Sequence, residues 1–210
     1  MSLTSVERAE LSDLLDALGP DAPTLCEGWT TRDLAAHLVV REGRPDAAAG
    51  IIGGPLAGWT RRVQDRAAAG DYAELVDKVR NGPPTLSYFR LPGMDSSANA
   101  FEYLVHHEDV RRAQPDWAPR ELPPKASDSI WARLKKNGGS LIYRQATTGV
   151  TLRRPDGEEI VARKGEPMVT LVGEPVELVL QAFGRGDHAH VEILGDPDAV
   201  ETFSGSSFGI

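Results

Sequence analysis

A proline-rich segment at residues 114–124 divides this chain into two parts. It contains four prolines. Proline lacks the backbone N–H that a helix interior or a central strand requires, so neither element can run through this segment. The hydrophobic period is helical before the segment and mixed after it. We therefore expect two domains, residues 1–114 and 127–210, joined by a linker at residues 115–126.

The first part has the pattern of a helical bundle. Within residues 6–19, apolar side chains recur at spacings of three and four, which is typical of an amphipathic helix. Thr30 and Asp33 have the spacing of a capping box, so a second helix is expected to begin at Thr30 and to bend near Pro45. Further helices are predicted at about residues 59–67, 72–79 and 99–113.

The second part mixes the two kinds of element. After a linking helix at residues 127–136, residues 151–163 predict a β-hairpin with Asp156-Gly157 at its turn. A strand at 168–172, a helix at 175–183 and a last strand at 189–194 follow. The expected fold class is therefore α+β, with an N-terminal four-helix bundle followed by a small C-terminal α+β domain.

The overall composition narrows the classes of function. The chain has 23 Lys and Arg against 31 Asp and Glu, a net charge of −8, which disfavours nucleic-acid binding. Its apolar runs are too short for a membrane span of about 20 residues. One cysteine cannot form an internal disulfide, and the first eight residues do not have the pattern of a secretion signal. We expect a cytoplasmic protein that does not bind membranes.

Three side chains have the pattern of a metal site. Glu102 and His106 are four residues apart, which places them on one face of a helix. If His37 projects from a facing helix, the three form a set of nitrogen and oxygen ligands that suits Zn²⁺ or a similar divalent ion. The alternatives are that Glu102 completes a capping box begun by Asn99, and that both histidines are buried structural residues.

Neighbouring residues leave other roles open. His107 points about 100° away from His106, so only His106 shares the face of Glu102, and His107 has a supporting or structural role. Asp33 either caps its helix or orients the free ring nitrogen of His37. Cys26 is interpreted as a small buried apolar residue rather than a nucleophile.

Two segments of the bundle resemble a known family. The stretch from Trp29 to His37, followed by the stretch from Phe101 to Asp109, is similar to the metal-binding domain of the mycothiol-dependent maleylpyruvate isomerase family, which belongs to the DinB/YfiT-like helical bundles. Residues 169–185 resemble the C-terminal domain of that family, which is of the sterol-carrier-protein type. The resemblance covers nearly the whole chain and is weakest at residues 43–98.

The resemblance implies a function. In that family a histidine on one helix and a Glu-x-x-x-His pair on another hold a divalent metal, usually zinc, and here the matching residues are His37, Glu102 and His106. The family uses mycothiol as a thiol cofactor, which adds to an activated double bond, permits cis-to-trans rotation and leaves. We therefore expect a zinc-dependent thiol transferase or isomerase that acts on a small electrophile, as a monomer or a homodimer. The alternatives are a metal-dependent hydrolase that activates water and a non-catalytic metal-binding or ligand-binding protein.

Arg185 is a candidate substrate-binding residue. It follows Gly184 at the end of the apolar helix predicted at residues 175–183, and the resemblance places this Gly-Arg pair in the domain that faces the bundle. Its guanidinium could hold an anionic group of the substrate or thiol. The alternative is an arginine that is merely favoured at the C-terminal end of a helix.

Overall fold

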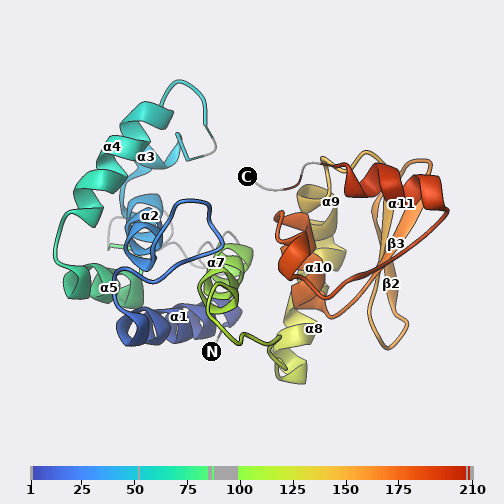
Figure 1. Cartoon of the computed structure of the whole chain (residues 1–210), viewed down its shortest axis with the longest axis horizontal. Helices are drawn as coiled ribbons and strands as arrows, with labels where there is room; N and C mark the ends of the chain where they lie inside the picture. The colour runs from blue at the N-terminus through green and yellow to red at the C-terminus, as the bar shows by residue number, and fades with distance from the viewer. Residues whose placement is uncertain (1, 52, 85–86, 88–98, 207, 209–210) are drawn as a thin grey trace. The chain divides into compact units, whose positions relative to one another are not determined.

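The chain folds into two compact units, residues 1–118 and residues 119–210 (Figure 1). A computed structural model describes residues 2–51, 53–84, 87, 99–206 and 208. The first unit is helical, and the second combines helices with a small sheet. The predicted α+β class is thus confirmed.

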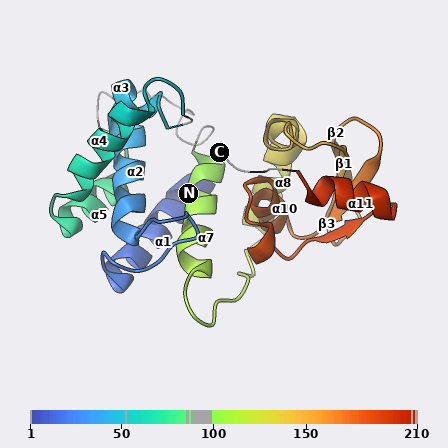
Figure 2. The ribbon, with the colours of Figure 1, turned by 45° about the horizontal axis from the view of Figure 1, so that its top comes forward.

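In the described part of the first unit, four helices pack into a bundle and two further helices lie beside them (Figure 2). In chain order they are α1 (Leu3–Leu18), α2 (Thr31–Gly43), α3 (Pro45–Ala48), α4 (Ala57–Ala68), α5 (Tyr72–Asn81) and α7 (Ala100–Arg112). Helices α1, α2, α5 and α7 form the predicted bundle, and α4 packs against α2.

The bundle is held together by one apolar core. Its buried residues come from all four bundle helices, in the stripes expected from the sequence. They are Leu11, Leu15, Leu34, Ala35, Ala36, Leu38, Leu75, Val76, Val79, Tyr103 and Val110. Burial of this stripe fixes the faces that α2 and α7 turn toward each other.

Local signals explain where the helices begin and end. Helix α1 begins three residues before the predicted start because Oγ of Ser2 accepts a hydrogen bond from the Ser5 N–H, at 3.1 Å. The predicted capping box of Thr30 and Asp33 is present at the start of α2. Pro45 disfavours a helical conformation at Arg44, whose φ is −130° and ψ is 79°, so the predicted bent helix is instead two separate helices, α2 and α3.

The second unit contains a four-stranded mixed sheet in the order β2-β1-β3-β4. The strands are β1 (Gly149–Arg153), β2 (Glu159–Arg163), β3 (Met168–Val172) and β4 (Glu192–Leu194). Strands β1 and β2 form the predicted antiparallel hairpin, β3 runs parallel to β1, and β4 is antiparallel to β3. The last strand is shorter than predicted, because only residues 192–194 pair with β3 and residues 189–191, which follow the 3₁₀ turn η3 (Gly186–His188), do not.

Helices cover this sheet. They are α8 (Pro124–Arg133), the π-helical turn η2 (Leu134–Gly138), α9 (Gly139–Ile142), α10 (Pro175–Ala182) and α11 (Pro197–Ser204). Helices α8, α9 and α10 lie together on one side of the strands (Figures 1 and 2). Helix α11, which the sequence analysis did not identify, packs against β3. Among the described residues, no helix is both long and apolar enough to cross a bilayer.

Candidate metal centre

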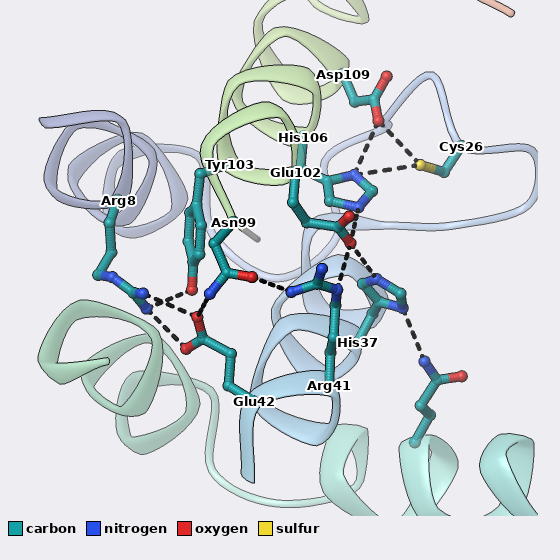
Figure 3. Close-up of polar contacts among 11 residues, drawn as sticks. Arg8, Cys26, His37, Arg41, Glu42, Asn99, Glu102, Tyr103, His106 and Asp109 are labelled. Atoms are coloured by element: carbon teal, nitrogen blue, oxygen red, sulfur yellow. Dashed lines mark hydrogen bonds and ion pairs between the residues drawn. The ribbon is translucent and has the colours of Figure 1, made fainter. Parts of the chain in front are cut away.

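The structure brings His37, Glu102 and His106 together between α2 and α7 (Figure 3). His37 comes from the second turn of α2, Glu102 from the first turn of α7, and His106 from the next turn of α7. All three side chains are largely buried, and Glu102 is the most exposed of them at 15%. The i, i+4 spacing thus places both α7 residues on the face that meets His37.

The distances within this group suit a divalent metal. Oε1 of Glu102 lies 3.2 Å from Nε2 of His37 and 3.4 Å from Nε2 of His106. Ligand atoms bound tetrahedrally to zinc at about 2.0–2.1 Å lie about 3.3 Å from one another. The donor atoms are thus of the kinds that zinc binds, and both distances from the Glu102 oxygen agree with the spacing of zinc ligands.

Each histidine has a hydrogen-bond partner on its second ring nitrogen. Nδ1 of His106 lies 3.0 Å from Oδ2 of Asp109, and Nδ1 of His37 lies 3.0 Å from the side-chain amide of Gln64 on α4. Both partners leave Nε2 of the ring facing the centre. Asp109 accepts from His106, as is typical of carboxylates beside metal-binding histidines, whereas the amide nitrogen of Gln64 donates to Nδ1 of His37. Gln64 replaces Asp33 in this role, because Asp33 caps α2.

The three groups perturb one another's ionisation. Burial lowers the pKa of His37. Burial opposes ionisation of His106 as well, but hydrogen bonds to Asp109, Cys26 and Glu102 raise its pKa well above 6.5. Burial of Glu102 is likewise outweighed by hydrogen bonds from the two histidines, which lower its pKa well below 4.5. These shifts favour an ionised Glu102 carboxylate, a charged His106 imidazole and a neutral His37 imidazole.

Cys26 lies beside the outer partner of His106. Its Sγ is 3.2 Å from Oδ2 of Asp109 and 3.9 Å from Nδ1 of His106. The side chain is half-buried against the bundle core rather than fully buried as expected, and its thiol belongs to the polar surroundings of the centre. Cys26 and Asp109 are 83 residues apart, so no local sequence pattern could predict this contact.

The contacts of Glu102 differ from those of a capping box. Asn99 occupies the N-cap position of α7, but its amide contacts Arg41 and Glu42, while the Glu102 carboxylate contacts Arg41 and the two histidines. Glu102 and Asn99 therefore do not form a capping box.

His107 lies apart from the centre. Its Nδ1 is 2.7 Å from Oε2 of Glu7 on α1, and Oε2 of Glu10 is 4.0 Å away. The 100° offset from His106 turns its side chain toward α1. His107 therefore links α7 to α1, which agrees with the expected structural role.

Arg185 lies in the second unit, after α10. Its guanidinium donates a hydrogen bond to the carbonyl oxygen of Phe183, which is at the C-terminal end of that helix. Gly184, with φ of 79°, makes the turn that brings the side chain back to this carbonyl. This contact is the one expected of a helix-end arginine, and the substrate-binding role of Arg185 stays a prediction.

Comparisons with known proteins agree with the arrangement of these elements. Neither the scan against protein-family models nor the search of curated proteins found a match. Among solved structures, the chain is similar to a mycothiol-dependent maleylpyruvate isomerase, with a TM-score of 0.58 and 15% identity. It is also similar to a variant of such an isomerase in which a histidine is replaced by alanine, with a TM-score of 0.59 and 14% identity. Each alignment covers 91% of this chain and 90% of the other.

The chain has the fold of a mycothiol-dependent maleylpyruvate isomerase. The structural likeness extends over both units, because neither unit is small enough to fall outside a 91% alignment. It supports the maleylpyruvate isomerase resemblance drawn from the motifs around His37 and Glu102. At 15% identity the likeness is one of fold, and a shared fold does not by itself imply a shared activity.

Proposed function

We propose that the chain is a metal-dependent thiol transferase or isomerase of the maleylpyruvate isomerase family, with mycothiol as its thiol cofactor. The observation that carries the proposal is the convergence of His37 Nε2 and His106 Nε2 on Oε1 of Glu102, at 3.2 Å and 3.4 Å. The shared fold of the mycothiol-dependent maleylpyruvate isomerase supports the choice of thiol chemistry.

The residues of the bundle have separate tasks in this proposal. His37, Glu102 and His106 would hold the ion, and two imidazoles with one carboxylate are a donor set that zinc takes in catalytic sites. Three protein ligands leave a position for an exogenous group. Asp109 and Gln64 keep the two imidazole rings turned so that Nε2 faces the centre.

A divalent metal at such a site is a Lewis acid that lowers the pKa of a thiol or a water molecule. The two histidine side chains are buried, and Glu102 is the most exposed of the three at 15%. The substrate would be a small electrophile with an activated double bond or a similar acceptor. In an isomerisation the sulfur–carbon bond forms and later breaks, so the thiol is regenerated.

Metal content and thiol dependence test the proposal together. Protein purified without added metal is analysed for bound metals, loaded with zinc, and incubated with mycothiol and a panel of electrophiles that includes maleylpyruvate and epoxides. We expect stoichiometric zinc and turnover that requires both zinc and mycothiol. Turnover that needs water and zinc but no thiol would instead identify a hydrolase, and absence of bound metal would refute the site.

A further inference from the structure

Arg41 lies beside the candidate metal ligands without having the chemistry of a ligand. It is one turn after His37 on α2, and its Nε lies 3.1 Å from Oε1 of Glu102. This is the same oxygen that faces Nε2 of both His37 and His106. Arg41 therefore contacts the one carboxylate atom on which the geometry of the centre depends (Figure 3).

Arg41 is itself held in place by a chain of buried polar contacts. Its guanidinium donates to Oδ1 of Asn99, and Nδ2 of Asn99 donates to Oε1 of Glu42 at 2.8 Å. The Glu42 carboxylate in turn receives two hydrogen bonds of 2.8 Å from Arg8 on α1. Asn99, Glu42 and Arg8 are all buried, so this chain has little freedom to rearrange.

Charge alone does not account for an arginine at this position. A fixed positive charge close to a cation site repels the cation and lowers its affinity. The compensating effect is geometric. The planar guanidinium offers donors in fixed directions, so that one donor reaches Glu102 while another reaches Asn99. A flexible ammonium group cannot reproduce this arrangement.

We propose that Arg41 is a positioning residue of the metal centre, which holds the Glu102 carboxylate so that Oε1 faces both histidines. The inference rests on the proposed metal site, since it assigns a role toward the same ion. The competing explanation is that Arg41 only bridges α2 to α7 and contributes to stability. The two explanations differ in what a change of shape at constant charge does to metal binding.

The test is Arg41→Lys, which keeps the positive charge and removes the guanidinium geometry. The Kd for Zn²⁺ is measured by competition with a chromophoric chelator, and the visible absorption of the Co²⁺-loaded protein reports the coordination geometry. We expect Arg41→Lys to raise the Kd by about tenfold or more, as loss of an outer partner does, and to change the Co²⁺ spectrum. The matched control is Arg44→Lys, because Arg44 lies three residues after Arg41 on the chain and forms an exposed pair with Asp46.

The outcomes separate this inference from the proposed function. A wild-type protein that binds no metal would refute the function. A wild type that binds zinc, together with an Arg41→Lys variant of unchanged Kd and spectrum, would overturn the positioning role alone. If Arg41→Lys does not fold, Asn99→Ser is tested instead. This change removes the amide oxygen that accepts a hydrogen bond from Arg41 and keeps the positive charge of Arg41. Weaker zinc binding in Asn99→Ser supports the role, and unchanged binding refutes it.

Discussion

The Oε1 atom of Glu102 lies 3.2 Å from Nε2 of His37, although 65 residues separate the two in the sequence. The contact exists because α2 and α7 bury apolar stripes in the same core, which turns one face of each helix toward the other. Polar atoms brought together at this depth require partners, and a carboxylate with two imidazoles is a donor set for a metal ion.

The first prediction concerns the three candidate ligands. His37→Ala, Glu102→Ala and His106→Ala should each lose stoichiometric zinc, because two remaining ligands hold the ion too weakly. His107→Ala is the matched control, since the His107 ring contacts Glu7 on α1 rather than the centre. Metal analysis after gel filtration gives the answer. Zinc retained by all three ligand variants would contradict the assignment.

The second prediction concerns the outer partner of His106. Asp109→Asn keeps the shape of the side chain but removes the charge that orients the imidazole, so the Kd for zinc should rise by about 10-fold to 100-fold. Asp33→Asn is its control. Asp33 caps α2, so this change should lower the free energy of unfolding by roughly 1 kcal/mol and leave the zinc affinity unchanged. Equal effects of the two variants on zinc affinity would be the contrary result.

The third prediction is that zinc binding releases a proton. In the metal-free protein the pKa of His106 is raised well above 6.5, so its imidazole carries a proton at pH 7 that a metal must displace. The pKa of His37 is lowered, so this ring is already neutral. Calorimetry in buffers of different ionisation enthalpy should give a release of about one proton at pH 7. Affinity should rise with pH until the folded pKa of His106 is passed.

The same pKa shifts affect the stability of the metal-free protein. Above pH 6.5 this stability should fall with rising pH, whereas the zinc affinity should rise. Because the folded pKa of His106 is raised, its contribution to stability is complete below about 6.5 and is lost as the pH rises through the folded value. The pKa of Glu102 is lowered, so its contribution is present above 4.5 and is lost as the pH falls through the folded value. Above pH 6.5 the Tm should therefore fall for the metal-free protein and rise for the zinc-loaded protein. A parallel pH dependence of the two forms would contradict the assignment.

Much of this arrangement follows from local sequence. The spacing of Glu102 and His106 predicts a shared helix face, and Thr30 with Asp33 predicts the start of the helix that carries His37. Hydrophobic period and the Asp-Gly turn are sufficient for the bundle helices and the hairpin of the second unit. These features depend on residues within a few positions of one another, which is why a single sequence reveals them.

The contacts that surround the centre could not be predicted in this way. Gln64 reaches His37 from α4, and Cys26 reaches Asp109 from a loop, each across a long separation in sequence. Arg41 has the helical spacing of a partner for His37, but its partners Glu102 and Asn99 come from α7 or its N-cap. Such pairs are set by how the helices pack, and no local pattern marks them.

The fourth prediction concerns the buried pair of Arg8 and Glu42. Both side chains are more than nine-tenths buried, and two hydrogen bonds join them. Glu42→Gln or Arg8→Met leaves one charge without its counterion, so each should lower the free energy of unfolding by roughly 3–5 kcal/mol. Urea denaturation of the metal-free protein measures this. The double variant should lose less than the sum of the two single losses, and simple additivity would show that the pair is not coupled.

The last prediction concerns Arg185, whose guanidinium donates to the carbonyl oxygen of Phe183. A lysine can also donate to a helix-end carbonyl and favour the helix dipole, so Arg185→Lys should be harmless if that is the only role. A clamp on an anionic group of the substrate or thiol needs two parallel donors, which lysine does not have.

We expect Arg185→Lys and Arg185→Ala both to lower kcat/KM by about tenfold or more, with zinc content unchanged and Tm close to that of the wild type. Turnover is compared once the thiol-dependent reaction has been found, and zinc content and Tm are measured on the same samples. Full activity in Arg185→Lys would show that Arg185 only stabilises the end of its helix and does not bind the substrate or the thiol. A loss of activity that follows a loss of folded protein would lead to the same conclusion, because a clamp acts on turnover without acting on the fold.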